Sequence, residues 1–205
     1  VCETLQQHGH KAYVVGGAVR DLLIGAEPKD FDIATDATPE QVRRAFRRSR
    51  IIGRRFRLVH VMCGPDTVEV STFRGTQEDG ESGEQVHDEH GRILRDNVFG
   101  NQQQDATRRD FTMNALFYDP ATQEIWDYYG GIKDLKARRL RIIGDSEQRY
   151  REDPVRMLRA VRLAAKLGME IDSATAGPIS RLAPLMDRVP AARAVFTRCP
   201  TVETP

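Results

Sequence analysis

The sequence has few cysteines and no long apolar run, and each shortage excludes a class of protein. Its three cysteines, Cys2, Cys63 and Cys199, are widely spaced and form no Cys-x-x-Cys pair. This spacing argues against a disulfide framework and a structural zinc site, and it favours a reducing compartment, the cytoplasm. No run approaches the length of a transmembrane helix and no secretory pattern opens the chain, so we expect no membrane partner.

Two common nucleotide-binding motifs are also absent. The pair Gly16–Gly17 is followed by no Gly-Lys-Ser/Thr, which excludes a Walker P-loop, and it does not form Gly-x-Gly-x-x-Gly. Internal repeats are absent. No histidine has a partner pattern typical of a catalytic base, and His60 in "RLVHVMCG" is expected to be an ordinary strand residue. The chain opens with "VCETLQQHGH" and no methionine, so we expect it to be a piece of a longer protein.

The net charge of +1 hides a strong segregation of charge. Arginines crowd residues 41–57 and 151–166, whereas acids gather in residues 78–89. Such runs are usually solvated faces. They also suit the binding of a polyanion, because the fork of arginine matches phosphate. Charge alone leaves both interpretations open.

Short strand and helix patterns predict an α/β (α+β) head with a mixed, partly antiparallel sheet. Residues 10–17 have the pattern of a buried strand that ends in a glycine turn, followed by a short helix that ends at Gly25. Thr38 and Pro39 are typical of a helix start. The β-rich runs that follow have no long helices between them, so some should pair antiparallel; they are residues 50–53, 57–64 and 67–75.

The later part of the chain is predicted to become helical. Residues 76–95 have no period and predict a loop. The helix that ends at Gly168 should bury one stripe, namely Val155, Leu158, Val161 and Ala165. The expected organisation is an α/β head, a helical segment and an atypical tail, over residues 1–143, 144–193 and 194–205.

Two aspartates in "KDFDIATD" are candidate metal ligands. Residues two apart on a strand point to the same side, about 7 Å apart at the backbone. Asp30 and Asp32 can therefore converge on one point while Phe31 and Ile33 anchor the opposite face. Such a pair suits Mg²⁺, which accepts one or two carboxylates together with waters and phosphate oxygens. For the pair alone, an amphipathic strand with an acidic wet face is the favoured explanation.

Two further acids are candidates for the same site. Glu69 alternates with valines in "TVEVSTF", so it either joins the aspartates or lies on the wet side of an edge strand. Asp110 in "RRDFTMNAL" is either a third site acid or a surface acid paired with Arg108 or Arg109. Three acids around two metals is the arrangement for in-line nucleotidyl transfer.

Glycines and arginines offer candidate phosphate contacts. Gly16 and Gly17 join a strand to a helix, where backbone N–H groups are accessible to phosphate, and Arg20 lies one turn further on. A tight turn with a surface arginine is the alternative. In "EDPVRMLRAVR" a polar stripe repeats at steps of three, and either capping and solvation or contacts to a base and phosphates explain it. The stripe consists of Asp153, Arg156, Arg159 and Arg162.

Taken together, "GGAVRDLLIG…KDFDIATD", "RRDFTMNAL" and "EDPVRMLRAVR" resemble the class II polynucleotide nucleotidyltransferases of the DNA polymerase β-like superfamily. This family comprises bacterial poly(A) polymerases and tRNA CCA-adding enzymes. The resemblance runs from about residue 11 to 185, and the motifs are highly specific as a set. It implies two Mg²⁺ ions held by Asp30 and Asp32, with Asp110 as a third catalytic carboxylate.

The resemblance also implies how ATP would be bound as a substrate. The residues implied to contact its triphosphate or base are Gly16, Gly17, Arg20, Arg109, Asp153, Arg156, Arg159 and Arg162. The arginine-rich run over residues 43–57 suits an RNA 3′ end that is held through the charge of the RNA phosphate backbone. Its candidate RNA contacts are Arg54, Arg55 and Arg57.

Within the family, "IIGRRFRLVHVMCG" and "LRDNVFG" resemble the poly(A) polymerase branch. The favoured function is therefore template-independent addition of AMP from ATP to RNA 3′ ends, with release of pyrophosphate, in RNA polyadenylation. The alternatives are a tRNA CCA-adding enzyme and a catalytically inactive RNA-binding fragment. RNA-decay proteins are candidate partners. Residues 194–205 depart from the family's amphipathic neck helix.

Overall fold

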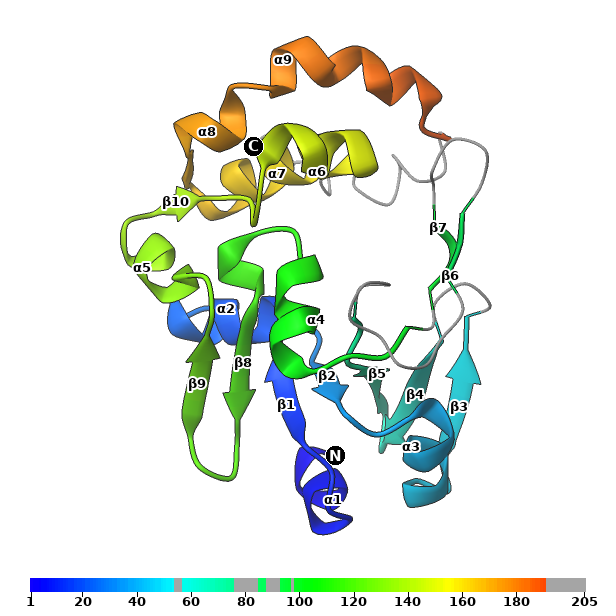
Figure 1. The fold of residues 1–205 in the computed structure, drawn as a ribbon. Coiled ribbons are helices and arrows are strands. Elements are labelled where there is room, and N and C mark those ends of the chain that lie inside the picture. The colour runs from blue at the N-terminus through cyan, green and yellow to red at the C-terminus, as the bar shows by residue number, and fades with distance from the viewer. Residues whose placement is uncertain (54–56, 76–84, 88–92, 97, 191–205) are drawn as a thin grey trace. The chain divides into compact units, whose positions relative to one another are not determined.

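The computed structural model describes residues 1–53, 57–75, 85–87, 93–96 and 98–190 (Figure 1). The chain forms two compact units, of which the first comprises Val1–Arg109 with Asn114–Tyr129, and the second Asp110–Met113 with Gly130–Pro205. None of the helices in the described ranges has the length and apolar character that crossing a membrane requires. Cys2 and Cys63 are both free thiols.

A seven-stranded mixed sheet forms the centre of the first unit, in the order β3-β4-β5-β2-β1-β8-β9. Its strands are β1 (Ala12–Val15), β2 (Asp32–Thr35), β3 (Ser49–Ile52), β4 (Leu58–Cys63), β5 (Asp66–Thr72), β8 (Leu116–Asp119) and β9 (Glu124–Asp127). Only β2 and β5 pair parallel within this sheet, and its other pairs are antiparallel. The partly antiparallel sheet and the short helices confirm the predicted fold class.

One face of this sheet is buried beneath helices α1 (Cys2–Gln7) and α3 (Pro39–Ala45). Register places Ile33 beside Val70 and Val70 beside Val59, so these side chains share the face. They belong to a buried cluster that includes Leu5 of α1 and Val42 of α3. We call this side of the sheet the helix-covered face.

Helix α3 begins as the sequence predicts. The hydroxyl of Thr38 accepts the backbone N–H of Gln41, and the side chain of Gln41 accepts the backbone N–H of Thr38. Pro39 occupies the first turn, where its missing N–H costs no hydrogen bond. This capping box fixes the start of the helix that covers the sheet.

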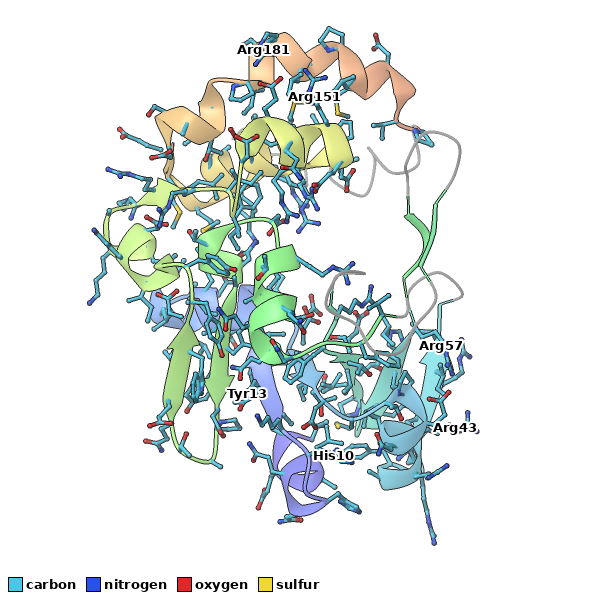
Figure 2. All side chains as sticks on the ribbon, viewed as in Figure 1. His10, Tyr13, Arg43, Arg57, Arg151 and Arg181 are labelled. Atoms are coloured by element: carbon cyan, nitrogen blue, oxygen red, sulfur yellow. The ribbon has the colours of Figure 1, made fainter. Side chains whose placement is uncertain are left out.

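Aromatic side chains pack around Phe117 of β8. Its ring centroid lies 6.3 Å from those of Tyr13 and Phe73, and 6.5 Å from that of Tyr128. Tyr13 is labelled in Figure 2, beside the sheet. The T-shaped pairs add about 0.5–1.5 kcal/mol each beyond the buried area. The end of the sheet formed by β1, β8 and β9 is therefore a rigid support.

The prediction of a loop over residues 76–95 was wrong where the structure describes this segment. Within the predicted loop, β6 (Gln85–His87) and β7 (Ile93–Asp96) pair antiparallel, although the rest of residues 76–92 lies outside the described ranges. This pairing joins two segments that are close in the chain, and the Gly-, Glu- and His-rich composition around them does not indicate it. Helix α4 (Gln102–Arg108), the turn η1 (Thr112–Asn114) and β8 then follow, which agrees with the predicted helix and strand.

The second unit is mainly helical. Its elements are α5 (Gly131–Lys136), β10 (Arg139–Leu140), α6 (Ser146–Glu152), α7 (Val155–Leu167), β11 (Glu170–Ile171), α8 (Ser173–Ala176), α9 (Ile179–Leu182) and the 3-10 helix η2 (Ala183–Arg188). The parallel pair β10–β11 was not predicted. Tyr150 of α6 is fully buried, and its hydroxyl donates to the backbone oxygen of Thr175, 2.9 Å away.

The predicted buried stripe of α7 was correct at Val155 and wrong at its other three residues. Leu158 and Val161 are 37% and 51% exposed, and Ala165 is exposed as well. The buried residues are Val155, Met157, Ala160 and Ala164. Steps of three drift around a helix of 3.6 residues per turn, and α7 packs through the 157–160–164 side against α6, β10 and β11. Gly168 ends the helix in the left-handed conformation, as predicted.

Candidate active site

Asp32 lies where two neighbouring strands bring charges together. It is the first residue of β2, beside Glu69 of β5 on one side and Val15 of β1 on the other. The residue is exposed by surface area, yet protein atoms remove part of the hydration of its carboxylate. This desolvation and the charges of Glu69 and Asp30 raise the pKa of Asp32, whereas Arg109 lowers it. An excess of negative charge is therefore concentrated at this end of β2.

The predicted strand position of Asp30 was wrong. Strand β2 starts at Asp32, so Asp30 and Phe31 precede it, and Phe31 is 44% exposed instead of anchored in the core. The reason is that β1 ends at Val15, which is the partner of Asp32, and the chain then turns at the diglycine. Asp30 still contributes to the raised pKa of Asp32, so the two carboxylates interact.

Glu69 connects Asp32 to two basic side chains across the sheet. Register places Glu69 beside His60 of β4, and His60 beside Arg50 of β3. The Nε2 atom of His60 lies 3.1 Å from Oε1 of Glu69. We call these four residues, Asp32, Glu69, His60 and Arg50, the charged row. Because directly paired residues share a side, the row lies on the sheet face opposite α3.

The diglycine turn lies close to two arginine side chains. Gly16 has φ +71°, a left-handed conformation that favours glycine. A Cβ atom at Gly16 would lie 3.5 Å from Nη1 of Arg109, and one at Gly17 would lie 3.3 Å from Nη2 of Arg20. Gly17 is also the first residue of α2 (Gly17–Leu23). Two guanidinium groups therefore approach the backbone of this turn.

Asn114 connects these two arginines, and sequence reasoning missed its role. Its Oδ1 accepts Nη1–H of Arg20 at 2.7 Å, and its backbone oxygen accepts Nη1–H of Arg109 at 3.4 Å. Arg20 is only 6% exposed and also donates to Asp21, while Arg109 forms an ion pair with Asp105 at 2.9 Å. Asn114 stands within the quoted "RRDFTMNAL", so that motif could have indicated it.

Asp110 belongs to the second unit and is held by Arg159. Nη2 of Arg159 lies 2.6 Å from Oδ2 of Asp110, whose side chain is 10% exposed. The backbone N–H of Phe111 donates to Oδ1 of Asp110 at 2.8 Å. The sequence left Asp110 either as a third site acid or as a surface acid paired with Arg108 or Arg109; the ion pair with Arg159 joins it to helix α7.

The start of α7 orders two other predicted residues. Oδ1 of Asp153 accepts the backbone N–H of Val155, the first residue of α7, at 3.3 Å. Nη1 of Arg156 donates to Glu152 at 3.1 Å, the expected i,i+4 pair, and to the backbone oxygen of Arg149 at 2.7 Å. Burial and the charge of Arg156 lower the pKa of Arg149, while Glu152 and Asp110 oppose this shift. Arg162 is half-buried further along α7.

The predicted site residues thus fall into two groups. The first unit contains Gly16, Gly17, Arg20, Asp30, Asp32, Glu69 and Arg109. The second contains Asp110, Asp153, Arg156, Arg159 and Arg162. Arg54 and Arg55 lie outside the described residues, and Arg57 forms an ion pair with Glu40, whose pKa it lowers.

The first group has the donor chemistry for Mg²⁺. In the described ranges no three carboxylate, imidazole or thiol side chains form a complete cation cage. Mg²⁺ needs no such cage, because it usually keeps several waters and binds one or two carboxylates together with substrate phosphates. The mutual repulsion of the Asp32, Asp30 and Glu69 carboxylates is the imbalance that a cation would relieve. Asp30 and Asp32 therefore fit this role.

Comparison with known proteins places these motifs in a family. Residues 12–141 match the family model of the poly A polymerase head domain. The chain is 57% identical over 191 residues to "Poly(A) polymerase I" of Escherichia coli O6:H1, covering 92% of this chain and 41% of that protein. It is 38% identical over 176 residues to a "CCA-adding enzyme" of Bacillus pumilus, covering 86% and 42%.

The fold agrees with these sequence matches. The crystal structure of the Bacillus stearothermophilus CCA-adding enzyme in complex with CTP aligns with a TM-score of 0.82 and 36% identity, over 96% of this chain and 45% of that one. The chain spans about two-fifths of the length of the curated relatives it matches. The match over residues 12–141 shows that the chain belongs to the poly A polymerase head domain family.

Proposed function

We propose that the protein containing this chain is a template-independent polynucleotide adenylyltransferase. It would join AMP from ATP to the 3′-OH of RNA and release pyrophosphate. The observation that carries this proposal is the Asp32 carboxylate, which lies between Glu69 and the turn at Gly16 and within the electrostatic influence of Arg109. The identity of 57% to a protein named Poly(A) polymerase I favours adenylyl transfer over CCA addition.

The residues of the first unit would bind the triphosphate and the metal. Asp30 and Asp32 would hold Mg²⁺, which when bound lowers the pKa of an attacking hydroxyl and stabilises the leaving phosphate. Arg109 and Arg20, which approach the diglycine, would balance the charge of the triphosphate. Asp105 and Asn114 hold these guanidinium groups, so little side-chain freedom would be lost on binding.

The residues of the second unit would serve the base and the primer. Asp153 and Arg156 are proposed to offer an acceptor and a fork of donors to the edge of the adenine. The contacts of Arg156 to Glu152 and Arg149 pre-orient that fork. Asp110 is proposed to orient or deprotonate the 3′-OH, with Arg159 as its counter-ion and Arg162 as a phosphate contact.

Outside the site, arginines would hold the RNA through the charge of its phosphate backbone. The proposed contact Arg57 is engaged by Glu40, and Figure 2 shows Arg57 and Arg43 at the end of the sheet that carries β3 and β4. Four further arginines on and after α3 are exposed and form no ion pair with a described residue; they are Arg43, Arg44, Arg47 and Arg48. We propose that these assist Arg54, Arg55 and Arg57 in binding phosphates. The free thiols Cys2 and Cys63 support a proposed cytoplasmic location, where RNA-decay proteins would be partners.

Extension of a labelled RNA by the full-length protein tests this function. ATP and CTP are supplied separately, both to a generic RNA and to a tRNA that lacks its CCA end. We expect stepwise addition of AMP to both RNAs, and loss of this addition in Asp30→Ala and Asp32→Ala. Asp66→Ala, an exposed acid of the same sheet outside the charged row, is the matched control.

The other outcomes identify the alternatives. Efficient addition of CMP to the tRNA would support a CCA-adding enzyme, which the similarity to the Bacillus enzymes keeps as the second candidate. Salt-sensitive RNA binding without Mg²⁺-dependent ATP binding would support an inactive RNA-binding protein. Unchanged AMP incorporation in both aspartate variants would refute the assigned site.

A further inference from the structure

His60 is a member of the charged row that has no part in the mechanism above. We propose that His60 is a positioning residue that fixes the carboxylate of Glu69 beside Asp32. This inference rests on the proposed function, because the positioned group belongs to the proposed catalytic site. It assigns a role to a histidine that the sequence pattern indicated only as a strand residue.

The sheet register makes the contact specific. Glu69 is paired with Asp32 on its β2 side and with His60 on its β4 side, so the backbone holds all three in line. The side chain of Glu69 is 53% exposed, and without a contact it would sample several rotamers. The hydrogen bond of 3.1 Å to Nε2 of His60 fixes one of its oxygens.

Electrostatics explains why this position needs support. The charge of Glu69 raises the pKa of Asp32, so the two carboxylates repel each other across the β2–β5 pair. Repulsion favours movement of the exposed Glu69 side chain into solvent. An ionised carboxylate only accepts hydrogen bonds, so Nε2 of His60 must be the donor and hold Glu69 in the row. Arg50, paired with His60 on β3, is the other charged group beside the imidazole.

The exposure of the His60–Glu69 pair argues against a large contribution of this pair to folding stability. The side chain of His60 is 32% exposed and that of Glu69 is 53% exposed, and such surface pairs contribute about 0–1 kcal/mol to folding. Removing His60 should therefore leave the protein folded. A loss of catalytic rate without a loss of stability would then report on the position of Glu69.

The chain contains a matched control for the experiment. Nδ1 of His10 lies 3.3 Å from Oδ1 of Asp36, with side chains that are 23% and 42% exposed, so this is a second partly exposed pair of a histidine and a carboxylate. Figure 2 shows His10 near α1, and its partner Asp36 follows the end of β2 opposite to Asp32. His10 thus repeats the chemistry of His60 outside the charged row.

The first experiment measures AMP incorporation by full-length wild type, His60→Ala, His60→Gln and His10→Ala. We expect His60→Ala to lower kcat about 10- to 100-fold, the range for residues that orient site groups, with KM for ATP changed less than about twofold. His60→Gln should recover much of the loss, because its amide N–H can donate to Glu69, and His10→Ala should match wild type. An unchanged kcat in His60→Ala, or a rise in KM alone, would overturn the positioning role.

The second experiment needs no activity and no metal. The ring ¹⁵N signals of His60, recorded by NMR in EDTA, should show a protonated Nε2 in wild type and a shift of that signal in Glu69→Leu. Signals that are the same in both proteins would show that the contact does not exist. If wild-type protein incorporates no AMP, the proposed function fails, while this measurement still decides whether His60 binds Glu69.

Discussion

The two faces of the seven-stranded sheet are made from alternate residues of the same strands, yet different forces shape them. On the helix-covered face, Ile33, Val70 and Val59 are each at most 4% exposed and pack beneath α1 and α3. On the other face, their neighbours Asp32, Glu69 and His60 form the charged row. Because the side-chain period of a strand is two, one register positions both sets. Burial on one face thus stabilises the register that brings like charges together on the other.

The largest expected effect is a contrast between substitutions at two adjacent residues of β2, one of which should lower stability and the other activity. Ile33→Ala should lower the free energy of unfolding by about 2–5 kcal/mol, because it leaves a cavity in the helix-covered face. Urea unfolding followed by circular dichroism measures this loss. Asp32→Asn, one position away, should abolish AMP incorporation without destabilising the fold. Similar stability losses in the two variants would contradict the division between the faces.

The next effect concerns the arginines of α3, which point away from the charged row because α3 covers the opposite face. Arg43→Ala/Arg44→Ala should weaken binding to single-stranded RNA, and should lower the slope of log affinity against log salt by about 1.4, or 0.7 for each lost phosphate contact. Fluorescence anisotropy over a salt series measures the slope. Lys133→Ala/Lys136→Ala on α5 is the control with equal charge. An equal decrease in the control would mean that net charge, and not this surface, binds RNA.

Local patterns were sufficient to predict much of the fold. The strands of the seven-stranded sheet were recognisable from alternation and β-rich runs, the start of α3 from Thr38 and Pro39, and the end of α7 from Gly168. Each of these features depends on residues within a few positions of one another. The family motifs likewise supplied the candidate residues of the site.

Features that depend on distant partners could not be predicted. Nothing in "KDFDIATD" indicates that Asp32 pairs with Glu69, because that depends on the strand order β5-β2-β1. The His60–Glu69 contact and the Asp110–Arg159 ion pair likewise join separate elements. The start of β2 at Asp32 was missed because the partner strand sets it. The sequence indicated which residues are candidates for the site, whereas strand register determines which of them are neighbours.

A smaller effect is expected at the helix that covers the sheet. Thr38→Ala removes the acceptor for the N–H of Gln41 and should lower the free energy of unfolding by about 1 kcal/mol. Thr38→Ser keeps the hydroxyl and should remain close to wild type. Thermal unfolding followed by circular dichroism compares them. A loss in Thr38→Ser as large as that in Thr38→Ala would show that the cap is not the cause.

The smallest effect is a pH-dependent stability difference at Asp32. Desolvation and Glu69 raise the pKa of Asp32 above its ordinary value of 3.8, so the folded state binds this proton more tightly than the unfolded state does. Stability contributed by Asp32 therefore falls as pH rises from about 3.9 through the folded-state pKa, and it stays low at neutral pH.

In EDTA, Asp32→Asn should be slightly more stable than wild type at pH 7, and this advantage should disappear below about pH 4. Asp66→Asn controls for the loss of one exposed charge. Mg²⁺ should reduce the difference in stability between Asp32→Asn and wild type, because it stabilises only the wild type. An advantage that persists at low pH would mean that Asp32 is not held in a repulsive carboxylate cluster, and the charged row would lose its electrostatic basis.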